Sequence, residues 1–319
     1  MTSAGAVVEV GVDLGGTATR VVVRHDDVTV GHTTVTTSDL GKGSPDQRAR
    51  SLWSVIKDIV STDMDLSSIG IAASGPIDVR TGIIENADTL EWFSGFNLVG
   101  LMAALSGVPV FIENDAVAAA IGEYQHGAGR DAERLLLVTL GTGIGVALLE
   151  HGQPFRQFNG QHPDSGHIPV FGDNVICYCG LTGCWEQSAS RLALERALSP
   201  LHSGEVSPTE LISLISAKAR GGDEMATEAF VEYGRKVGRG IALLHTVYGP
   251  SVTVIGGTVA NTFDLFSSGM NQSLTRADGF YLPVDIVRAE LGPEAGAIGA
   301  AALAKDRSSE KPSVLRKAT

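Results

Sequence analysis

Two glycine-rich segments have the composition of phosphate-binding turns. Asp13-Leu14-Gly15-Gly16-Thr17 follows a β-branched run, and Gly141-Thr142-Gly143-Ile144-Gly145 follows a second apolar run. Adjacent glycines let backbone N–H groups approach a phosphate closely, and Thr17 or Thr142 adds a hydroxyl donor. Asp13 could also hold Mg²⁺ through water. Neither segment has the sequence of a P-loop or of a dinucleotide-binding fingerprint, so an ordinary hairpin turn is the alternative for each.

An amide and a carboxylate stand where a predicted buried strand meets a predicted helix. Asp115 would occupy the first turn of that helix, where the helix dipole favours the ionised carboxylate. An ionised aspartate that faces a substrate hydroxyl can orient the hydroxyl and accept its proton during phosphoryl transfer. A plain helix N-cap is the alternative role for Asn114 or Asp115, and local features alone favour the cap.

A cluster of cysteines indicates a metal site. The sequence has three cysteines, Cys177, Cys179 and Cys184, within eight residues. An odd number in one tight cluster does not suit a disulfide framework and favours a metal in a reducing cytoplasm. His167 is the candidate fourth ligand of a structural zinc, with His162 and His151 as alternatives. Three unliganded core thiols are the alternative to a metal. The same segment carries Asp164 and Glu186, which with His167 could line a sugar site.

Strands and helices must position these residues, and the hydrophobic pattern predicts both. In the first part of the chain it predicts strands at 7–12, 20–24, 28–36, 69–73 and 108–113, and helices at 45–59, 98–105 and 115–124. In the second part it predicts strands at 135–140, 146–150, 251–255 and 284–288, and helices at 185–198, 208–219, 224–248 and 294–304. Both parts begin with a hairpin around a glycine turn, which suggests two related α/β domains with a cleft between them.

Composition limits the class of protein. The chain has 319 residues, with 24 Lys+Arg against 36 Asp+Glu, and thus a net charge of −12. This charge argues against nucleic acid or an anionic membrane as a partner, because both require a basic face. Glycine is enriched, at 39 residues, which indicates many turns and close backbone approaches. We expect a cytoplasmic protein, because the N-terminus lacks the charged start of a signal peptide and no stretch is suited to span a bilayer.

These motifs together resemble the ROK family of sugar kinases and sugar-responsive repressors, over nearly the whole chain. The segments that carry the resemblance are 13–17, Glu113-Asn114-Asp115-Ala116, 140–145, Gly166-His167, Cys177-x-Cys179-Gly180-x-x-Gly183-Cys184-x-Glu186 and 295–301. The resemblance implies an α/β, two-domain actin-like ATPase fold (hexokinase/ribonuclease H-like) with an interdomain cleft. We expect an N-terminal domain at 1–117 completed by a helix at 295–304. A C-terminal domain at 118–294 would carry the zinc knuckle, and 305–319 would be a frayed tail.

The resemblance also implies roles for individual residues. ATP and Mg²⁺ would bind at the two glycine turns, at Asp13, Gly15, Gly16, Thr17, Gly141, Thr142 and Gly143, with Gly256 and Gly257 near the adenosine. Asp115 would be the catalytic base. Asn114, Asp164, His167 and Glu186 match positions that bind sugar hydroxyls. A structural Zn²⁺ would be held by His167, Cys177, Cys179 and Cys184. The family usually has glutamate at the position of Asp164, and the shorter side chain draws a sugar-binding carboxylate back by about 1.5 Å.

The function implied is that of an ATP-dependent hexose kinase, glucokinase-like and acting on the 6-hydroxyl, in a homodimer. Alternatives are an N-acetylmannosamine kinase, a fructokinase or a non-catalytic sugar-binding ROK protein. A sugar-responsive repressor is disfavoured, because only twelve residues precede Asp13 and the chain is acidic. The sequence does not choose among the sugars.

Overall fold

The structure is a computed structural model that describes residues 5–172, 175–274 and 285–309. The chain forms two units. The first comprises Met1–Arg130, Arg156–His162 and Pro293–Thr319, and the second comprises Asp131–Phe155 and Pro163–Gly292. Residues 118–130 therefore belong to the first unit and not to the second, where the sequence analysis put them, because their helix packs on the C-terminal helix.

The first unit is built on a five-stranded mixed sheet. Its strands are β1 (Ala6–Leu14), β2 (Ala18–His25), β3 (Val28–Thr36), β4 (Met64–Ala73) and β7 (Val110–Asn114), in the order β3-β2-β1-β4-β7. β1 and β2 form the predicted hairpin around the first glycine turn, and β3 extends it antiparallel. β4 and β7 add parallel strands beside β1. A two-stranded pair, β5 (Ile77–Asp78) and β6 (Ile83–Ile84), lies outside this sheet.

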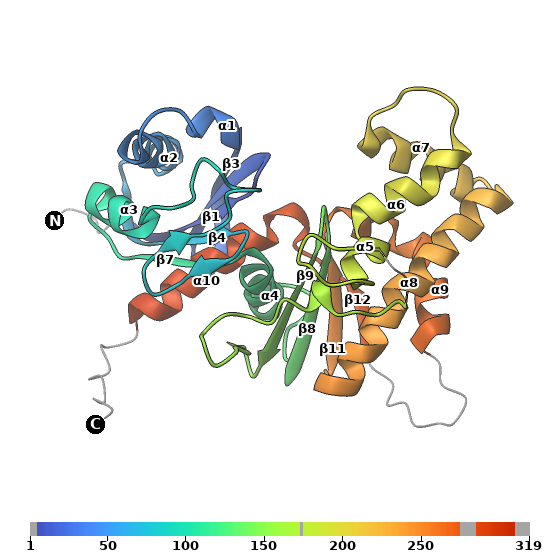
Figure 1. Ribbon diagram of the computed structural model, residues 1–319. Helices are drawn as coiled ribbons and strands as arrows, with labels where there is room; N and C mark the ends of the chain where they lie inside the picture. The colour runs from blue at the N-terminus through green and yellow to red at the C-terminus, as the bar shows by residue number, and fades with distance from the viewer. Residues whose placement is uncertain (1–4, 173–174, 275–284, 310–319) are drawn as a thin grey trace. The chain divides into compact units, whose positions relative to one another are not determined.

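Helices cover both faces of this sheet (Figure 1). One face carries α1 (Thr37–Leu40), α2 (Pro45–Ile59) and α3 (Leu98–Ser106), and the other carries α4 (Asp115–His126) and α10 (Ala295–Ser309). α2 begins at residue 45 because Ser44 and Gln47 form a capping box, with Pro45 at the first helical position. Leu52 and Ile56 then lie on one side of α2 and are buried in the core.

The second unit repeats this plan. Its sheet contains β8 (Arg134–Leu140), β9 (Ile144–Glu150), β10 (Gln153–Pro154), β11 (Val252–Gly256) and β12 (Asp285–Arg288), in the order β10-β9-β8-β11-β12. β8 and β9 are an antiparallel hairpin around the second glycine turn, while β11 and β12 are parallel to β8. The predicted duplication is therefore confirmed in strand order and direction.

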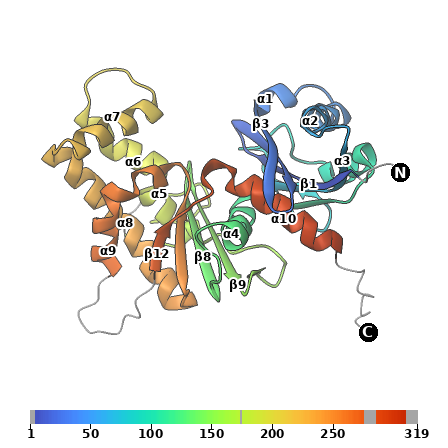
Figure 2. The same ribbon diagram turned by 180° about the vertical axis from the view of Figure 1, so that it is seen from behind.

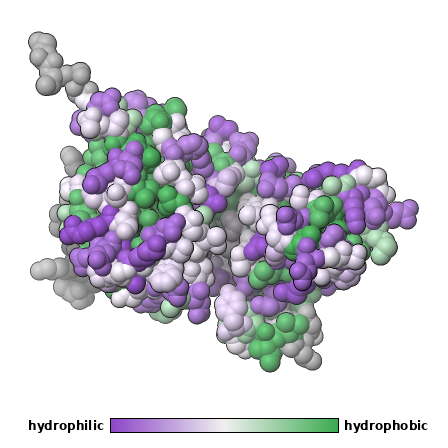
Figure 3. Space-filling view, turned by 90° about the horizontal axis from the view of Figure 1, so that it is seen from above, coloured by the Kyte–Doolittle hydropathy of each residue, from purple (hydrophilic) through white to green (hydrophobic). Residues whose placement is uncertain are grey.

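Helices of the second unit pack around one core (Figure 2). They are α5 (Trp185–Ala189), α6 (Arg191–Leu198), α7 (Pro208–Arg220), α8 (Glu224–Tyr248) and α9 (Phe263–Leu274). Short 3-10 helices occur at Ser165–His167, Ser199–Leu201, Thr258–Thr262 and Gly292–Glu294. Among the described residues, no helix is both long enough and apolar enough to cross a bilayer. Figure 3 shows hydrophilic and hydrophobic residues interspersed over one face of the molecule.

Three sequence predictions about helices require correction. The single helix predicted at 185–198 is two helices, because Ser190 is extended (φ −76°, ψ 174°) and its side chain caps α6 by accepting from Ala193 N. α9 was missed, although Phe266, Met270 and Leu274 recur at helical spacing and are buried in the core. The tail predicted to be frayed from residue 305 is helical to Ser309, and residues 310–319 lie outside the described part of the chain.

Glycines allow α10 to pack directly on the backbone of neighbouring elements, because glycine has no side chain. A Cβ built on Gly70 in β4 would lie 1.8 Å from the carbonyl oxygen of Ala300, and one built on Gly299 would lie 1.7 Å from that of Ala118 in α4. A Cβ built on Gly11 in β1 would likewise lie 1.8 Å from the carbonyl oxygen of Ala297 in α10. These glycines thus serve helix packing and not turns.

Replacing Gly299 with alanine should destabilise the first unit, although helix propensity alone predicts a gain of about 1 kcal/mol. The added methyl would collide with the α4 backbone, and overpacking of this kind costs about 1–3 kcal/mol. Urea unfolding of Gly299→Ala should show the net loss. Gly172→Ala is the control, because a Cβ there has no neighbour within 4 Å. Equal or greater stability of Gly299→Ala would contradict the packing.

Candidate active site

Asp115 lies at the first position of α4, beside the end of a neighbouring strand. Asn114 is the N-cap, and its Oδ1 accepts hydrogen bonds from Ala116 N at 2.9 Å and Val117 N at 3.2 Å. The carboxylate Oδ2 of Asp115 accepts from Ser74 Oγ at 2.7 Å. The sequence analysis offered a cap as the alternative role for either residue, and in the structure Asn114 is the cap.

Ser74 was not singled out in the sequence, and strand register is what brings it to Asp115. Ala73 at the end of β4 pairs with Asn114 at the end of β7 in a parallel register. The carboxyl ends of adjacent parallel strands meet at one edge, where open α/β sheets hold their ligands. A polar residue directly after each of two such strands was the available signal.

A buried ion pair at Glu113 fixes the backbone at the junction between β7 and α4, directly before Asp115. Glu113 is 1% exposed, and its Oε2 lies 2.5 Å from Arg156 Nη2 and 3.3 Å from Arg307 Nη2. The Glu113 Oε1 also accepts from Asn114 N at 3.1 Å. Two cations therefore satisfy the buried carboxylate, which holds the backbone directly before Asp115.

Asp13, near the end of β1, is a half-buried carboxylate in an unfavourable environment for its charge. Burial, and then the charge of Asp115, raise the pKa of Asp13 to about 7, and the Arg20 guanidinium opposes this shift. Arg20 Nη1 lies 3.6 Å from Asp13 Oδ2, because the two residues face each other across the β1–β2 hairpin. Two neighbouring carboxylates in a protected place are hard oxygen ligands of the kind that Mg²⁺ takes, so these residues fit a divalent cation.

The first glycine turn is held firmly through its backbone. Gly15 N donates to Ala18 O at 3.2 Å, and Thr37 closes the turn by donating from Oγ1 to Gly15 O and from its N–H to Thr17 O. The N–H of Gly15 is thus used within the turn. Gly16 and Thr17 are exposed and remain the candidates for contact with a phosphate.

The second glycine turn is attached to α5 and α6. Ile144 N donates to Glu186 Oε2 at 2.9 Å, and a Cβ on Gly143 would lie 2.2 Å from the same oxygen. Arg191 donates its backbone N–H to Gly141 O at 2.8 Å, and its Nη2 lies 3.3 Å from Thr142 Oγ1. Arg191 was not a sequence candidate, yet it brings a cation to this turn.

Gly256 and Gly257 lie at the end of β11, next to the second turn. Gly256 pairs in register with Thr139 in β8. Gly257 has φ +81°, and a Cβ there would approach the backbone of Leu140 to about 2.5 Å. The glycine is needed both for its left-handed backbone and for this contact. The two glycine segments of the second unit are therefore neighbours.

The four predicted metal ligands come together in the structure. The ligand atoms of His167, Cys177, Cys179 and Cys184 all lie within 4.8 Å of one another. His167 Nδ1 is 3.4 Å from Cys177 Sγ, and the sulfurs of Cys179 and Cys184 are 3.6 Å apart without a disulfide. Three thiols and one imidazole around a common centre fit a tetrahedral zinc site, and His167 supplies the imidazole.

The other ring nitrogen of His167 points to polar groups. Its Nε2 lies 3.1 Å from the Tyr178 hydroxyl and 3.6 Å from Asp164 Oδ2. Burial, and then the nearby Glu186 carboxylate, raise the pKa of the Tyr178 phenol. The structure therefore brings Asp164, His167 and Glu186 together around Tyr178, a residue that the sequence analysis passed over although it stands between two cysteine ligands.

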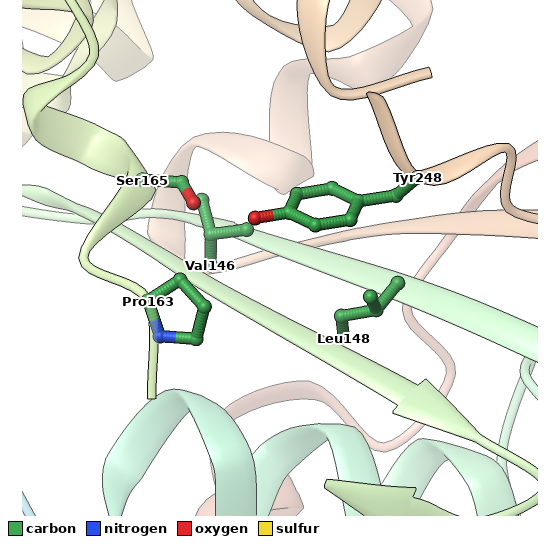
Figure 4. Close-up of a pocket in the computed structure, with 5 residues that line it drawn as sticks. All are labelled: Val146, Leu148, Pro163, Ser165 and Tyr248. Carbon is green, nitrogen blue, oxygen red and sulfur yellow. The ribbon is translucent and has the colours of Figure 1, made fainter. Parts of the chain in front are cut away.

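A small pocket in the second unit does not coincide with these groups (Figure 4). Val146, Leu148, Pro163, Ser165 and Tyr248 line it, and its empty volume is about 160 Å³. None of the predicted site residues lines this pocket, so it carries no part of the candidate site.

Several known proteins are similar to this chain over most of its length. The model of the ROK family matches residues 9–307. A glucokinase of Streptomyces coelicolor is 32% identical over 315 residues, covering 93% of this chain and 97% of the relative. A ROK family glucokinase from Streptomyces griseus, solved in complex with glucose and AMPPNP, is 30% identical, with a TM-score of 0.76 and coverage of 94% and 99%. The Escherichia coli regulator NagC is 31% identical over 250 residues, which cover 76% of this chain and 61% of the regulator.

The fold and its solved neighbours define an α/β protein of the actin-like ATPase class. The family match spans nearly the whole chain, and this protein belongs to the ROK family.

The raised pKa of Asp13 predicts a pH-dependent contribution to stability. Because the folded protein binds this proton more tightly than the unfolded chain, the contribution is complete below pH 3.8 and is lost as the pH rises through about 7. Asp13→Asn mimics the protonated form and lacks this loss. In Mg²⁺-free urea titrations, the stability of the wild type should fall relative to the variant by about 2–3 kcal/mol between pH 5 and pH 8. A constant difference across this range would show that Asp13 titrates normally.

Proposed function

We propose that this protein transfers the γ-phosphoryl group of ATP to a hexose hydroxyl, as a glucokinase-like kinase acting on the 6-hydroxyl. The observation that carries the proposal is Asp115 at the start of α4, oriented by Ser74 and next to a second acidic residue, Asp13. The similarity to glucokinases over more than nine-tenths of the chain supports the same activity.

Asp115 is the proposed catalytic base. Its Oδ2 accepts from Ser74, and this bond fixes the carboxylate so that it can align a sugar hydroxyl and take up its proton. Asn114 is committed to capping through Oδ1, which leaves its amide nitrogen as the atom to donate to a sugar. That nitrogen would lie 3.4 Å from a Cβ on Gly75, so the absence of a side chain there keeps its surroundings open.

The proposed sugar-binding groups of the second unit are Asp164, His167 and Glu186. His167 Nε2 is a donor when Nδ1 faces the thiols, and the two carboxylates are acceptors. This combination of one donor and two acceptors suits the vicinal hydroxyls of a sugar. Asp164 is exposed and carries one methylene less than the glutamate usual in the family. We expect its reach to influence which hexose fits.

The two glycine turns are the proposed phosphate sites, with Gly256 and Gly257 near the adenosine. Thr17 and Thr142 are exposed at their turns and offer hydroxyl donors. A Mg²⁺ ion held near Asp13 would neutralise charge on the transferring phosphoryl group. Arg20, paired with Asp13, and Arg191, paired with Glu195, place a guanidinium group at each turn.

A non-catalytic sugar-binding protein is the second candidate function. The similarity to NagC favours this second function, because the match to that regulator covers 76% of this chain. Such a protein would bind sugar without depending on Asp115. The same variant therefore separates the two functions.

Asp115→Asn should lower phosphotransfer by at least a hundredfold, the usual contribution of a positioned base. ADP release should be followed with a panel of hexoses, with ATP and polyphosphate compared as donors. Asp46→Asn is the control, since Asp46 also lies in the first turn of a helix of the first unit but far along the chain from the site residues. Activity of Asp115→Asn within tenfold of the wild type would remove Asp115 as the base.

We propose a structural Zn²⁺ at His167, Cys177, Cys179 and Cys184, supported by the convergence of these ligands. The ion would supply only cross-linking, because the chain provides all four ligands. It would hold the segment 167–184 against α5, where Cys184 is the N-cap and Glu186 follows.

Elemental analysis should give about one zinc per chain. The thiols should react with a colorimetric reagent only after chelation or denaturation, and chelation should lower the melting temperature. Cys177→Ser should lose the metal, whereas Ser188→Ala, in the adjacent α5, should keep it. Freely reactive thiols in native, metal-free protein would contradict the site.

We also propose that the protein is a cytoplasmic homodimer, on the basis of the family resemblance. The three described thiols are unpaired, which suits a reducing compartment. Light scattering of the purified protein gives the mass that tests the dimer.

A further inference from the structure

Tyr178 lies where three proposed sugar-binding side chains converge. Its hydroxyl is 3.1 Å from His167 Nε2, and the Glu186 carboxylate is close enough to raise the pKa of the phenol, after the larger effect of burial. Asp164 Oδ2 reaches the same imidazole nitrogen at 3.6 Å. The rings of Tyr178 and His167 meet edge to face, with centroids 5.0 Å apart. A single phenol oxygen is thus at the centre of this polar group.

The direction of the hydrogen bonds follows from the other side of the imidazole. Nδ1 of His167 faces Cys177 Sγ at 3.4 Å, and with Nδ1 as the zinc ligand proposed above it carries no proton. Nε2 then carries the ring proton and donates to the Tyr178 oxygen. The phenol proton is then available to Glu186, whose carboxylate accepts.

A sugar hydroxyl in the same place would make the same two bonds. It would accept from His167 Nε2 and donate to Glu186, because an alcohol and a phenol have the same donor and acceptor atoms. Both cannot occupy the place at once. Tyr178 and a sugar hydroxyl are therefore competitors for one pair of partners.

The phenol can leave this position without disturbing a core. Tyr178 is 78% exposed, and its neighbours Val175, Ile176 and Leu181 are exposed as well. The backbone on either side is held by two bonds, Gly180 N to Cys177 O at 2.9 Å and Cys177 N to Leu181 O at 2.8 Å. Rotation of the side chain alone is enough to turn the ring into solvent.

We propose that the Tyr178 hydroxyl is an internal substitute for a sugar hydroxyl, which holds His167 and Glu186 in the sugar-free protein and is displaced when the sugar binds. This inference rests on the proposed function. Tyr178 thereby sets sugar affinity and selects against sugars that lack a hydroxyl able to take both bonds. It is a specificity-determining residue that acts by competition.

Tyr178→Phe should bind the sugar more tightly, by about tenfold, because a net hydrogen bond to a charged group no longer opposes binding. Calorimetric titration of the full chain with the hexose panel, without ATP, measures this directly. The Michaelis constant for the sugar should fall by a similar factor while kcat stays unchanged. Tyr248→Phe is the control, because its hydroxyl belongs to the separate small pocket of the same unit.

A second readout is the absorbance of tyrosine during sugar binding. Sugar binding should move a phenol from a hydrogen-bonded position into water and give a tyrosine difference absorbance that Tyr178→Phe lacks. Unchanged or weaker binding by a Tyr178→Phe protein with wild-type metal content, or no tyrosine signal on wild-type binding, overturns the inference. Failure of the wild type to bind any hexose in the panel would instead count against the proposed function.

Discussion

The close packing of α10 is the constraint on which the acidic residues of the first unit depend. A Cβ on Gly296 would lie 3.1 Å from the carboxyl carbon of Asp13, and Gly299 contacts the backbone of Ala118, one turn after Asp115. One helix from the end of the chain thus contacts both elements that carry the two acids. Since interiors are close-packed, small residues along α10 fix the distance between β1 and α4.

Two polar side chains of the second unit, Glu186 and His167, each face two different groups. Glu186 supports the second glycine turn through Ile144 N and also lies near Tyr178. His167 presents one nitrogen to the thiols and the other to the polar group around Tyr178. The proposed metal, sugar and nucleotide positions therefore share residues, so a change at one of them is expected to alter the geometry of the others.

An acidic chain that binds an anionic nucleotide needs groups near the nucleotide that offset the repulsion between like charges. The net charge is −12, and the charge of Asp115 disfavours ionisation of Asp13. Arg20, paired with Asp13, and Arg191, paired with Glu195 and near Thr142, place a guanidinium group at each of the two turns. Local cations, backbone N–H groups and a divalent ion can thus replace a broadly basic surface, because charge interactions between exposed groups are screened over about 10 Å.

The sequence by itself determined most elements, the two hairpins and the cluster of one histidine with three cysteines. These depend on periodicity and short-range spacing, as in α2, α8 and the ten residues from His167 to Cys177. Only the tertiary structure decided that Ser74 contacts Asp115, that α4 stays with the first unit and that Tyr178 lies beside His167. Strand register, helix packing and side-chain rotation create those contacts. They join residues whose separation along the chain carries no periodic signal.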